Sequence, residues 1–229
     1  MNIKITKEQH LKLCKLEFKE YIFGSHLHRT NDINSDKDIL RVIKDNIIFN
    51  NSNTLGKYLP NIHIFQYDDI ENNTQYVYMT EYQFWYNLFS GDGHIISDII
   101  LLTDYFENPL FLCRTYKIIK GYLGLVKRDL KYYDKSEKKR LHCVRGLYIA
   151  QCLINNIKPS IENLHDYIQF IENKKYDNKE NFNHLLISLK KIASNLYENN
   201  TLTNYPIFDE KDDLVYKVIL ANNIKEFTY

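Results

Sequence analysis

Residues 21–43 read YIFGSHLHRTNDINSDKDILRVI, and this stretch decides the fold at the N-terminal end of the chain. Tyr21-Ile22-Phe23 predicts a short buried strand that ends at Gly24-Ser25. The residues from His26 to Lys37 are polar and predict a turn-rich connection. The apolar residues that follow predict a second strand from Asp38 to Ile43.

Asp36 and Asp38 stand two positions apart where the second strand begins. Side chains at positions i and i+2 of a strand point to the same face, so these two carboxylates are expected side by side. Two ionised carboxylates at that spacing repel each other, which is unfavourable unless a cation lies between them. Mg²⁺ (or Mn²⁺), held by one or two carboxylates and completed by water and phosphate oxygens, fits this demand. The alternative is a solvated loop with two exposed acids.

Gly24 and Ser25 precede the carboxylate pair at the end of the first strand. Glycine lets a backbone approach a phosphate closely, and serine offers a hydroxyl and an amide N–H to its oxygens. A phosphate-binding loop beside two metal-binding carboxylates is typical of active sites for phosphoryl or nucleotidyl transfer. We therefore expect an enzyme that acts on a phosphate-bearing substrate.

The stretch from Gly24 to Asp38 resembles the motif G-S-R-x-Y-G-x-x-T-P-x-S-D-x-D of the DNA polymerase beta-like nucleotidyltransferase superfamily. Within it, the likeness is to the small predicted nucleotidyltransferases of bacteria and phages. The spacing is the same, and five residues match: Gly24, Ser25, Ser35, Asp36 and Asp38. His26, His28 and Arg29 stand where that family usually has Arg, Tyr and Gly.

The resemblance implies transfer of a nucleoside monophosphate from an NTP to a hydroxyl, with release of pyrophosphate and with Mg²⁺ or Mn²⁺ as cofactor. Asp36 and Asp38 would be the catalytic metal ligands, and the acceptor would be an RNA 3′ end, a protein side chain or a small molecule. The phosphates would contact Gly24, Ser25, His26 and Ser35. The implied fold is α+β: a small mixed nucleotidyltransferase-type sheet (residues 1–80, the catalytic core), followed by a helical C-terminal lobe packed on it (residues 81–229).

A basic segment in the helical half supplies further candidates for phosphate binding. Residues 114–145 hold eleven basic residues against three acidic ones, a net charge of +8. Lys139, His142 and Arg145 share one helix face, which resembles a Lys-x-x-His-x-x-Arg face of the family, and Lys127 lies on the preceding helix. We expect these four to neutralise the leaving pyrophosphate, whereas the alternative is a solvated helix face.

A third carboxylate is the weak point of the resemblance. The family places it on the strand that corresponds to residues 75–80, where this chain has Gln75. An amide cannot accept the proton of the attacking hydroxyl, so Glu81, Asp68 or Asp69 would have to replace it. Otherwise the chain is a weakened relative that binds a nucleotide, a nucleic acid or a partner protein without turnover.

The remaining elements follow from hydrophobic periodicity. A helix is expected from Thr6 to Lys19, and residues 63–67 and 75–80 predict a hairpin beside the first strands. Helices are expected over 84–88, 95–102, 115–132, 141–154, 161–171 and 182–197. Most of the aromatic residues between 76 and 86 are expected in the core, with base stacking as the alternative.

Composition narrows the class of protein. The 229 residues carry 30 basic and 29 acidic side chains and are 44% hydrophobic, which excludes a disordered chain and a uniformly basic nucleic-acid coat. The four cysteines are scattered, so we expect reduced thiols in a cytoplasmic protein, in the host cytoplasm if the chain is viral. No apolar run is long enough to span a membrane, so no membrane partner is expected.

Overall fold

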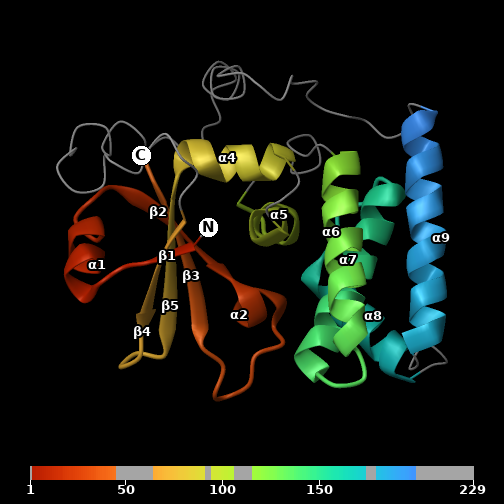
Figure 1. The fold of residues 1–229 in the computed structure, drawn as a ribbon, viewed down its shortest axis with the longest axis horizontal. Helices are drawn as coiled ribbons and strands as arrows, with labels where there is room; N and C mark the ends of the chain where they lie inside the picture. Colours follow the sequence, from red (N-terminus) through yellow and green to blue (C-terminus); the bar gives the residue numbers. More distant parts are fainter. Residues whose placement is uncertain (1, 45–63, 91–93, 106–114, 174–178, 200–229) are drawn as a thin grey trace. The chain divides into compact units, whose positions relative to one another are not determined.

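The computed structural model describes residues 2–44, 64–90, 94–105, 115–173 and 179–199, drawn in colour in Figure 1. The chain divides into two compact units, one with the described residues up to Tyr86 and one with those from Asn87 on. The first contains β1 (Asn2–Lys4), α1 (Lys7–Leu13), β2 (Phe18–Phe23), α2 (Gly24–His28), β3 (Lys37–Ile43), β4 (Ile64–Asp69), β5 (Thr74–Thr80) and the start of α4 (Glu81–Ser90). The protein is therefore α+β at its N-terminal end, as expected.

The first unit is built on a mixed five-stranded sheet with strand order β1-β4-β5-β3-β2. The predicted hairpin is confirmed, because β4 and β5 pair antiparallel. The two strands of the opening stretch, β2 and β3, also pair antiparallel, while β3 and β5 run parallel. This order puts β3 in the interior of the sheet, with both of its edges hydrogen-bonded to neighbouring strands.

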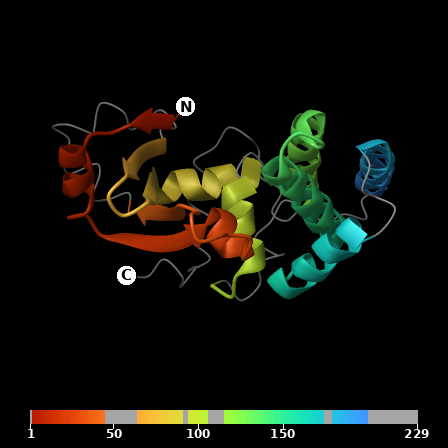
Figure 2. The same cartoon turned by 90° about the horizontal axis from the view of Figure 1, so that it is seen from below.

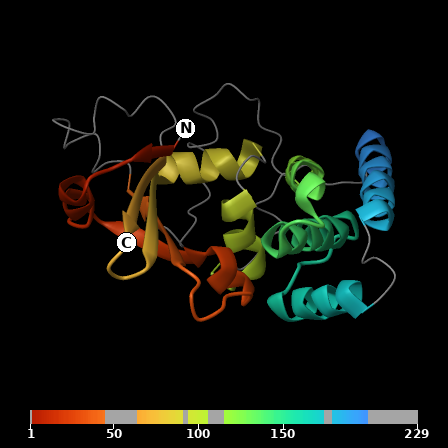
Figure 3. The ribbon, with the colours of Figure 1, turned by 60° about the horizontal axis from the view of Figure 1, so that its bottom comes forward.

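Successive side chains of a strand point to opposite faces of the sheet, and apolar residues are buried on both faces. Tyr21 and Leu40 are register partners and point to one face, where the ring of Tyr21 stacks on Phe84 of α4 at 5.8 Å. On the other face, Tyr78 and Leu13 of α1 belong to one buried cluster. Figure 3 shows α1 and α2 on opposite sides of the sheet. The aromatic run at the end of β5 is largely core, since Tyr78, Phe84 and Trp85 are fully buried.

Three local features differ from expectation. The expected helix from Thr6 to Lys19 begins correctly, because Thr6 forms a capping box with Gln9, but it ends at Leu13. Phe18 and Lys19 belong to β2 instead, because they pair with Ile43 and Val42 of β3. The short strand β1 and the short helix α2 were not expected. Each is too short to show a periodicity in sequence.

The second unit is helical in its described part. It contains α5 (His94–Leu102), α6 (Thr115–Asp129), the 3₁₀ turn η2 (Leu130–Tyr132), α7 (Glu137–Ile154), α8 (Ile161–Asn173) and α9 (Lys179–Glu198). The helices expected in these regions are confirmed. α6 packs against α7 and α9, and Figure 2 views α6 and α9 nearly end-on.

A glycine sets the close contact between α6 and α7. A Cβ on Gly146 would lie 2.7 Å from the Cγ2 atom of Val126, so the two helices approach more closely than a larger residue permits. None of the described helices is long and apolar enough to cross a bilayer. Cys14, Cys143 and Cys152 are free thiols, as expected, and Cys113 lies outside the described residues.

Candidate functional site

The centre of the candidate site is the contact between Gly24 and Asp38. β2 ends at Phe23, which is the register partner of Asp38 on β3. Gly24 then starts α2 with φ +66°, and a Cβ built on it would lie 2.0 Å from Oδ2 of Asp38. Glycine is therefore required twice, by the left-handed backbone and by the carboxylate beside it. The space that glycine leaves open is taken by Asp38, whereas the sequence suggested that a phosphate would use it.

The end of α2 explains one departure from the family motif. Arg29 caps this helix with φ 54°, a left-handed conformation in which a side chain is strained by roughly 1–2 kcal/mol. The motif has glycine at this position, and glycine adopts such a conformation without strain.

The loop that carries Ser35 is held by its own side chains. The Ser35 hydroxyl accepts from the backbone N–H of Asp32 at 2.9 Å and donates to Asp32 Oδ1 at 3.1 Å. Nε2 of His26 lies 3.5 Å from the Ser35 carbonyl oxygen, which Asn73 also approaches through Nδ2 at 3.3 Å. Ser35 and His26, both expected to contact phosphate, therefore also organise the loop. Ser25 lies half-buried in the first turn of α2.

The two expected metal ligands differ in their surroundings. Asp38 is half-buried within β3, while Asp36 is exposed and lies one residue before that strand begins. Two carboxylates suit a Mg²⁺ ion that arrives with a triphosphate, since such an ion takes its other ligands from phosphate and water. The described residues contain no group of three or more His, Cys, Asp or Glu that could hold a metal ion by themselves.

The third-acid position is filled by an amide. Gln75 is the register partner of Asp38 on the neighbouring strand β5, so the two side chains share a face of the sheet. On the next strand, Asp68 pairs in register with Gln75, and Gln75 Nε2 donates to Asp68 Oδ1 at 3.1 Å. Asp68 also forms an ion pair with Lys4 at 2.9 Å. Hydrogen bonds from Lys4, Gln66 and Gln75 hold the pKa of Asp68 below its usual value.

Of the suggested replacements, Glu81 is wrongly placed. In the parallel pair β3 and β5, Asp38 is opposite Gln75 at one end and Ile43 is opposite Thr80 at the other. Glu81 follows Thr80, so it lies about 20 Å along the strand direction from the level of Gln75, at roughly 3.3 Å per residue. Asp69 is adjacent to Asp68 but belongs to the opposite face of β4, by strand alternation.

The helical candidates lie in the second unit, and two of them are paired with a buried acid. Asp129 is 1% exposed and accepts from Arg128 Nε at 2.8 Å, Lys139 Nζ at 3.1 Å and His142 Nδ1 at 3.1 Å. Burial alone would raise the pKa of Asp129, but the hydrogen bonds from these three side chains hold it well below its usual value. Burial, and then the charge of Arg145, lowers the pKa of His142 to about 4.

Arg145 is directed to a second buried acid. Its Nε lies 3.7 Å from Asp98 Oδ2, and Asp98 accepts a short hydrogen bond from the Tyr122 hydroxyl. Sequence reasoning missed both Asp98 and Asp129. The available signal was the position of Asp98 inside the apolar run of residues 95–102, because a carboxylate buried there requires partners.

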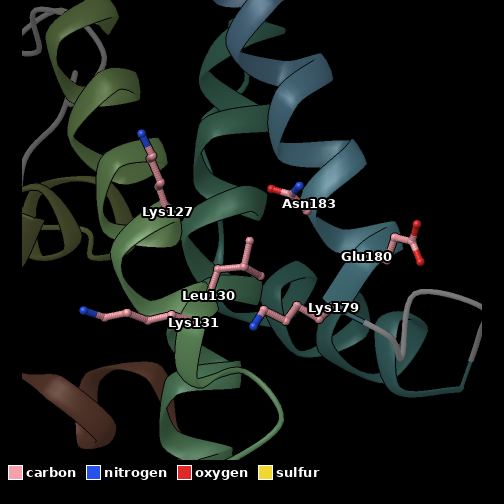
Figure 4. A pocket seen from close by; sticks show the side chains of 6 residues that line it. All are labelled: Lys127, Leu130, Lys131, Lys179, Glu180 and Asn183. Carbon is pink, nitrogen blue, oxygen red and sulfur yellow. The ribbon is translucent and has the colours of Figure 1, made fainter.

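Lys127 is different from the other three helical candidates. It is exposed and lines a hollow beside α9, shown in Figure 4, and no carboxylate in the described part of the chain forms an ion pair with it. The expected face of Lys139, His142 and Arg145 is thus already used for structure within its own unit. Lys127 alone keeps a charge available to an added anion.

A polar cluster on the other face of the sheet was also missed from the sequence. Arg41 donates through Nη1 to the Tyr78 hydroxyl at 3.0 Å and to the Cys14 sulfur at 3.1 Å, and through Nε to Glu20 at 2.9 Å. The Tyr78 hydroxyl lies 2.8 Å from Nδ1 of His10. Burial raises the pKa of Tyr78, so the hydroxyl stays protonated.

Comparison with family models, curated proteins and solved structures gives no match to this chain.

Proposed function

We propose that the protein is a Mg²⁺-dependent nucleotidyltransferase that moves a nucleoside monophosphate from an NTP to a hydroxyl acceptor. The observation that carries the proposal is the packing of the Asp38 carboxylate on the Cα of Gly24, where β2 turns into α2. A positive φ at Gly24 and a second carboxylate, Asp36, at the start of the same strand are consistent with a site built for a metal–phosphate ligand.

In this proposal each candidate site residue of the first unit has a defined role. Asp38 and Asp36 hold the metal, and Ser25 offers its hydroxyl to the phosphates. The packing of Gly24 fixes the Asp38 carboxylate in one position, so little ordering remains when the ligand binds. The chemistry supplied by bound Mg²⁺ or Mn²⁺ is neutralisation of phosphate charge and a lower pKa of the attacking hydroxyl. The acceptor is an RNA 3′ end, a protein side chain or a small molecule.

A second function, binding of the nucleotide without turnover, is favoured by Gln75. This amide is the register partner of Asp38, and the next carboxylate on that face, Asp68, is hydrogen-bonded to Gln75 and ion-paired with Lys4. A site with two carboxylates and an amide keeps the means to bind a metal–triphosphate but has an amide in place of a base at position 75. Both functions use Asp36 and Asp38, so the same variants test both, and separate measurements of transfer and of binding distinguish them.

The test is label transfer from each α-³²P-labelled NTP, with Mg²⁺ or Mn²⁺ and with total RNA or total protein as acceptor. We expect transfer by the wild type and none by the double variant Asp36→Asn, Asp38→Asn. The matched control is Glu17→Gln plus Glu71→Gln, which removes two charges from exposed residues of the same unit.

Three outcomes are informative. Transfer that survives in Asp36→Asn, Asp38→Asn contradicts the proposed chemistry. Metal-dependent NTP binding that this variant abolishes, without transfer by the wild type, supports the second function. Absence of both transfer and metal-dependent binding in a wild-type protein with a cooperative thermal transition contradicts both.

A further inference from the structure

We propose that the seam between α6 and α9 is a binding groove for the sugar–phosphate backbone of a short single-stranded nucleic acid. The proposal concerns the second unit alone and does not depend on nucleotidyl transfer, because binding is measured without an NTP. It begins from two hollows that lie along the same pair of helices.

The two hollows follow each other along the seam. The first has a volume of about 510 Å³ and is lined by the end of α6, the turn η2 and the start of α9: Lys127, Leu130, Lys131, Lys179, Glu180 and Asn183. The second, of about 320 Å³, is lined by the start of α6 and the later part of α9: Tyr116, Lys120, Leu123, Gly124, Lys190, Ala193 and Ser194. The helices are therefore antiparallel, and both hollows lie along the seam between them, which we call the groove.

The groove is basic along its whole length. Five lysines line it, and Glu180 is its one acidic lining residue in the described chain. Figure 4 shows the Glu180 carboxylate pointing away from Lys127 and Lys131. No ion pair within the described residues neutralises any of these lysines: Lys120, Lys127, Lys131, Lys179 and Lys190. Like charges gathered in this way repel each other, and an anion between them removes the repulsion.

Lys127 and Lys190 connect the two hollows. Burial, and then the positive charge of Lys127, lowers the pKa of Lys190. Lys127 is on α6 and lines the first hollow, whereas Lys190 is on α9 and lines the second. The two ammonium groups are therefore close enough across the seam to repel each other.

The length of the groove fits a strand better than a single phosphate. Lys120 and Lys131 are eleven residues apart, or about 16 Å at the rise of an α-helix. A stacked nucleic-acid strand carries one phosphate about every 3.4 Å, so this distance corresponds to about five phosphates. The chain's overall charge of +1 agrees with a short contact of this kind.

An aromatic pair at one end of the groove gives a place for a base. The rings of Tyr116 and Tyr197 are stacked, with centroids 3.9 Å apart and planes 9° from parallel. Tyr197 is 41% exposed, and Lys120 Nζ lies 5.7 Å from the Tyr116 ring. A lysine-lined track with an exposed aromatic ring is the combination that single-strand binding surfaces use.

The test uses a fluorescein-labelled 12-nucleotide oligouridylate and fluorescence anisotropy over a series of salt concentrations. We expect saturable binding that the pair Lys127→Gln, Lys190→Gln weakens at least fivefold. The slope of log K against log salt should fall by about 1.4, at roughly 0.7 per lost phosphate contact. Tyr197→Ala should weaken binding at least fivefold without changing that slope, because it removes stacking and no charge.

The matched control is Lys135→Gln plus Lys138→Gln, which removes the same charge from exposed lysines outside the groove. Retention of wild-type affinity in the control supports the proposal, and an equal loss in both pairs overturns it. Absence of saturable binding also overturns it. Displacement of the oligonucleotide by stoichiometric tripolyphosphate overturns it in favour of a small polyphosphate site. Thermal melting of each variant shows that it is folded.

Discussion

The carboxylate of Asp38 lies against the Cα of Gly24, so closely that a Cβ at position 24 would be 2.0 Å from Oδ2. Two residues fourteen positions apart therefore constrain each other. The Asp38 carboxylate occupies the space that a side chain at position 24 would need. The turn at Gly24, with φ +66°, in turn brings the backbone against this carboxylate and holds it in place.

Gly24→Ala is expected to lower the free energy of unfolding by about 2–4 kcal/mol. A left-handed backbone costs a side chain about 1–2 kcal/mol, and the overlap with Asp38 adds about 1–2 kcal/mol. Urea denaturation measures the change. Because part of the cost is the overlap, Gly24→Ala combined with Asp38→Ala should lose less than the sum of the single variants. Strict additivity would show that the contact is not the cause.

Arg29→Gly is expected to raise the free energy of unfolding, opposite to the effect of Gly24→Ala. The left-handed conformation at φ 54° strains Arg29 by about 1–2 kcal/mol, and glycine removes this strain at an entropic cost of about 0.4–1 kcal/mol. We expect a net gain of about 0.5 kcal/mol in unfolding free energy, measured by urea denaturation beside Gly24→Ala. A loss of 1 kcal/mol or more would show that the arginine side chain contributes more than the strain removes.

The sequence predicts most of this fold because the long elements repeat their apolar residues regularly. The β-branched and aromatic residues of 75–80 identify a strand, and the apolar residues at helical spacing in 141–154 identify a helix. The sequence predicts a helix at Phe18 and Lys19 because the apolar pattern before them is helical. Pairing with β3 decides otherwise, and such a contact between distant residues leaves no local signal.

The site is predicted less completely than the fold. Spacing identified Gly24 and Asp38 as members of one motif, but it did not show that the space beside Gly24 is filled by Asp38 itself. The net positive charge of residues 114–145 predicts that Lys139 and His142 are available to bind a phosphate. Charge counting cannot tell that Asp129, also in that segment, is buried and engages both. Burial of an acid is a property of helix packing, and it decides which cations stay available.

His142 should make the stability of the protein depend on pH between about 4 and 6.5. Its pKa is lowered to about 4 in the folded protein, from an ordinary value of 6.5. In this window the unfolded chain binds a proton that the folded protein does not, so the unfolding free energy falls as the pH falls. Asp129, whose pKa is also lowered, adds a loss of the same sign at still lower pH.

Urea denaturation at pH 7 and pH 4.5 measures this effect against a His142→Gln variant. We expect the wild type to lose about 2 kcal/mol more than the variant over this interval. His10 and His94 also have lowered pKa values and contribute equally to both proteins, so the difference isolates His142. Equal losses in the two proteins would contradict the assignment.

Gln75→Glu tests whether this position is the missing third carboxylate. Glutamate has nearly the shape of glutamine, and register places it beside Asp38 on the same face of the sheet. Without metal, the new charge lies near Asp38 and Asp68 and replaces the donor that Asp68 accepts from, so the melting temperature should fall. With Mn²⁺, a third carboxylate should raise it again, by more than Mn²⁺ raises the wild type.

The control for this prediction is Gln66→Glu, which also adds a carboxylate beside Asp68 on β4 but two positions further along the strand from the level of Asp38. A Mn²⁺-dependent gain in Gln75→Glu alone places the third ligand at position 75, and any rise in NTP turnover in the same variant supports the enzyme over the binder. An equal Mn²⁺ response in both variants would show that the added charge attracts the ion from any position on this face. In that case the register of Gln75 with Asp38 would have no part in metal binding.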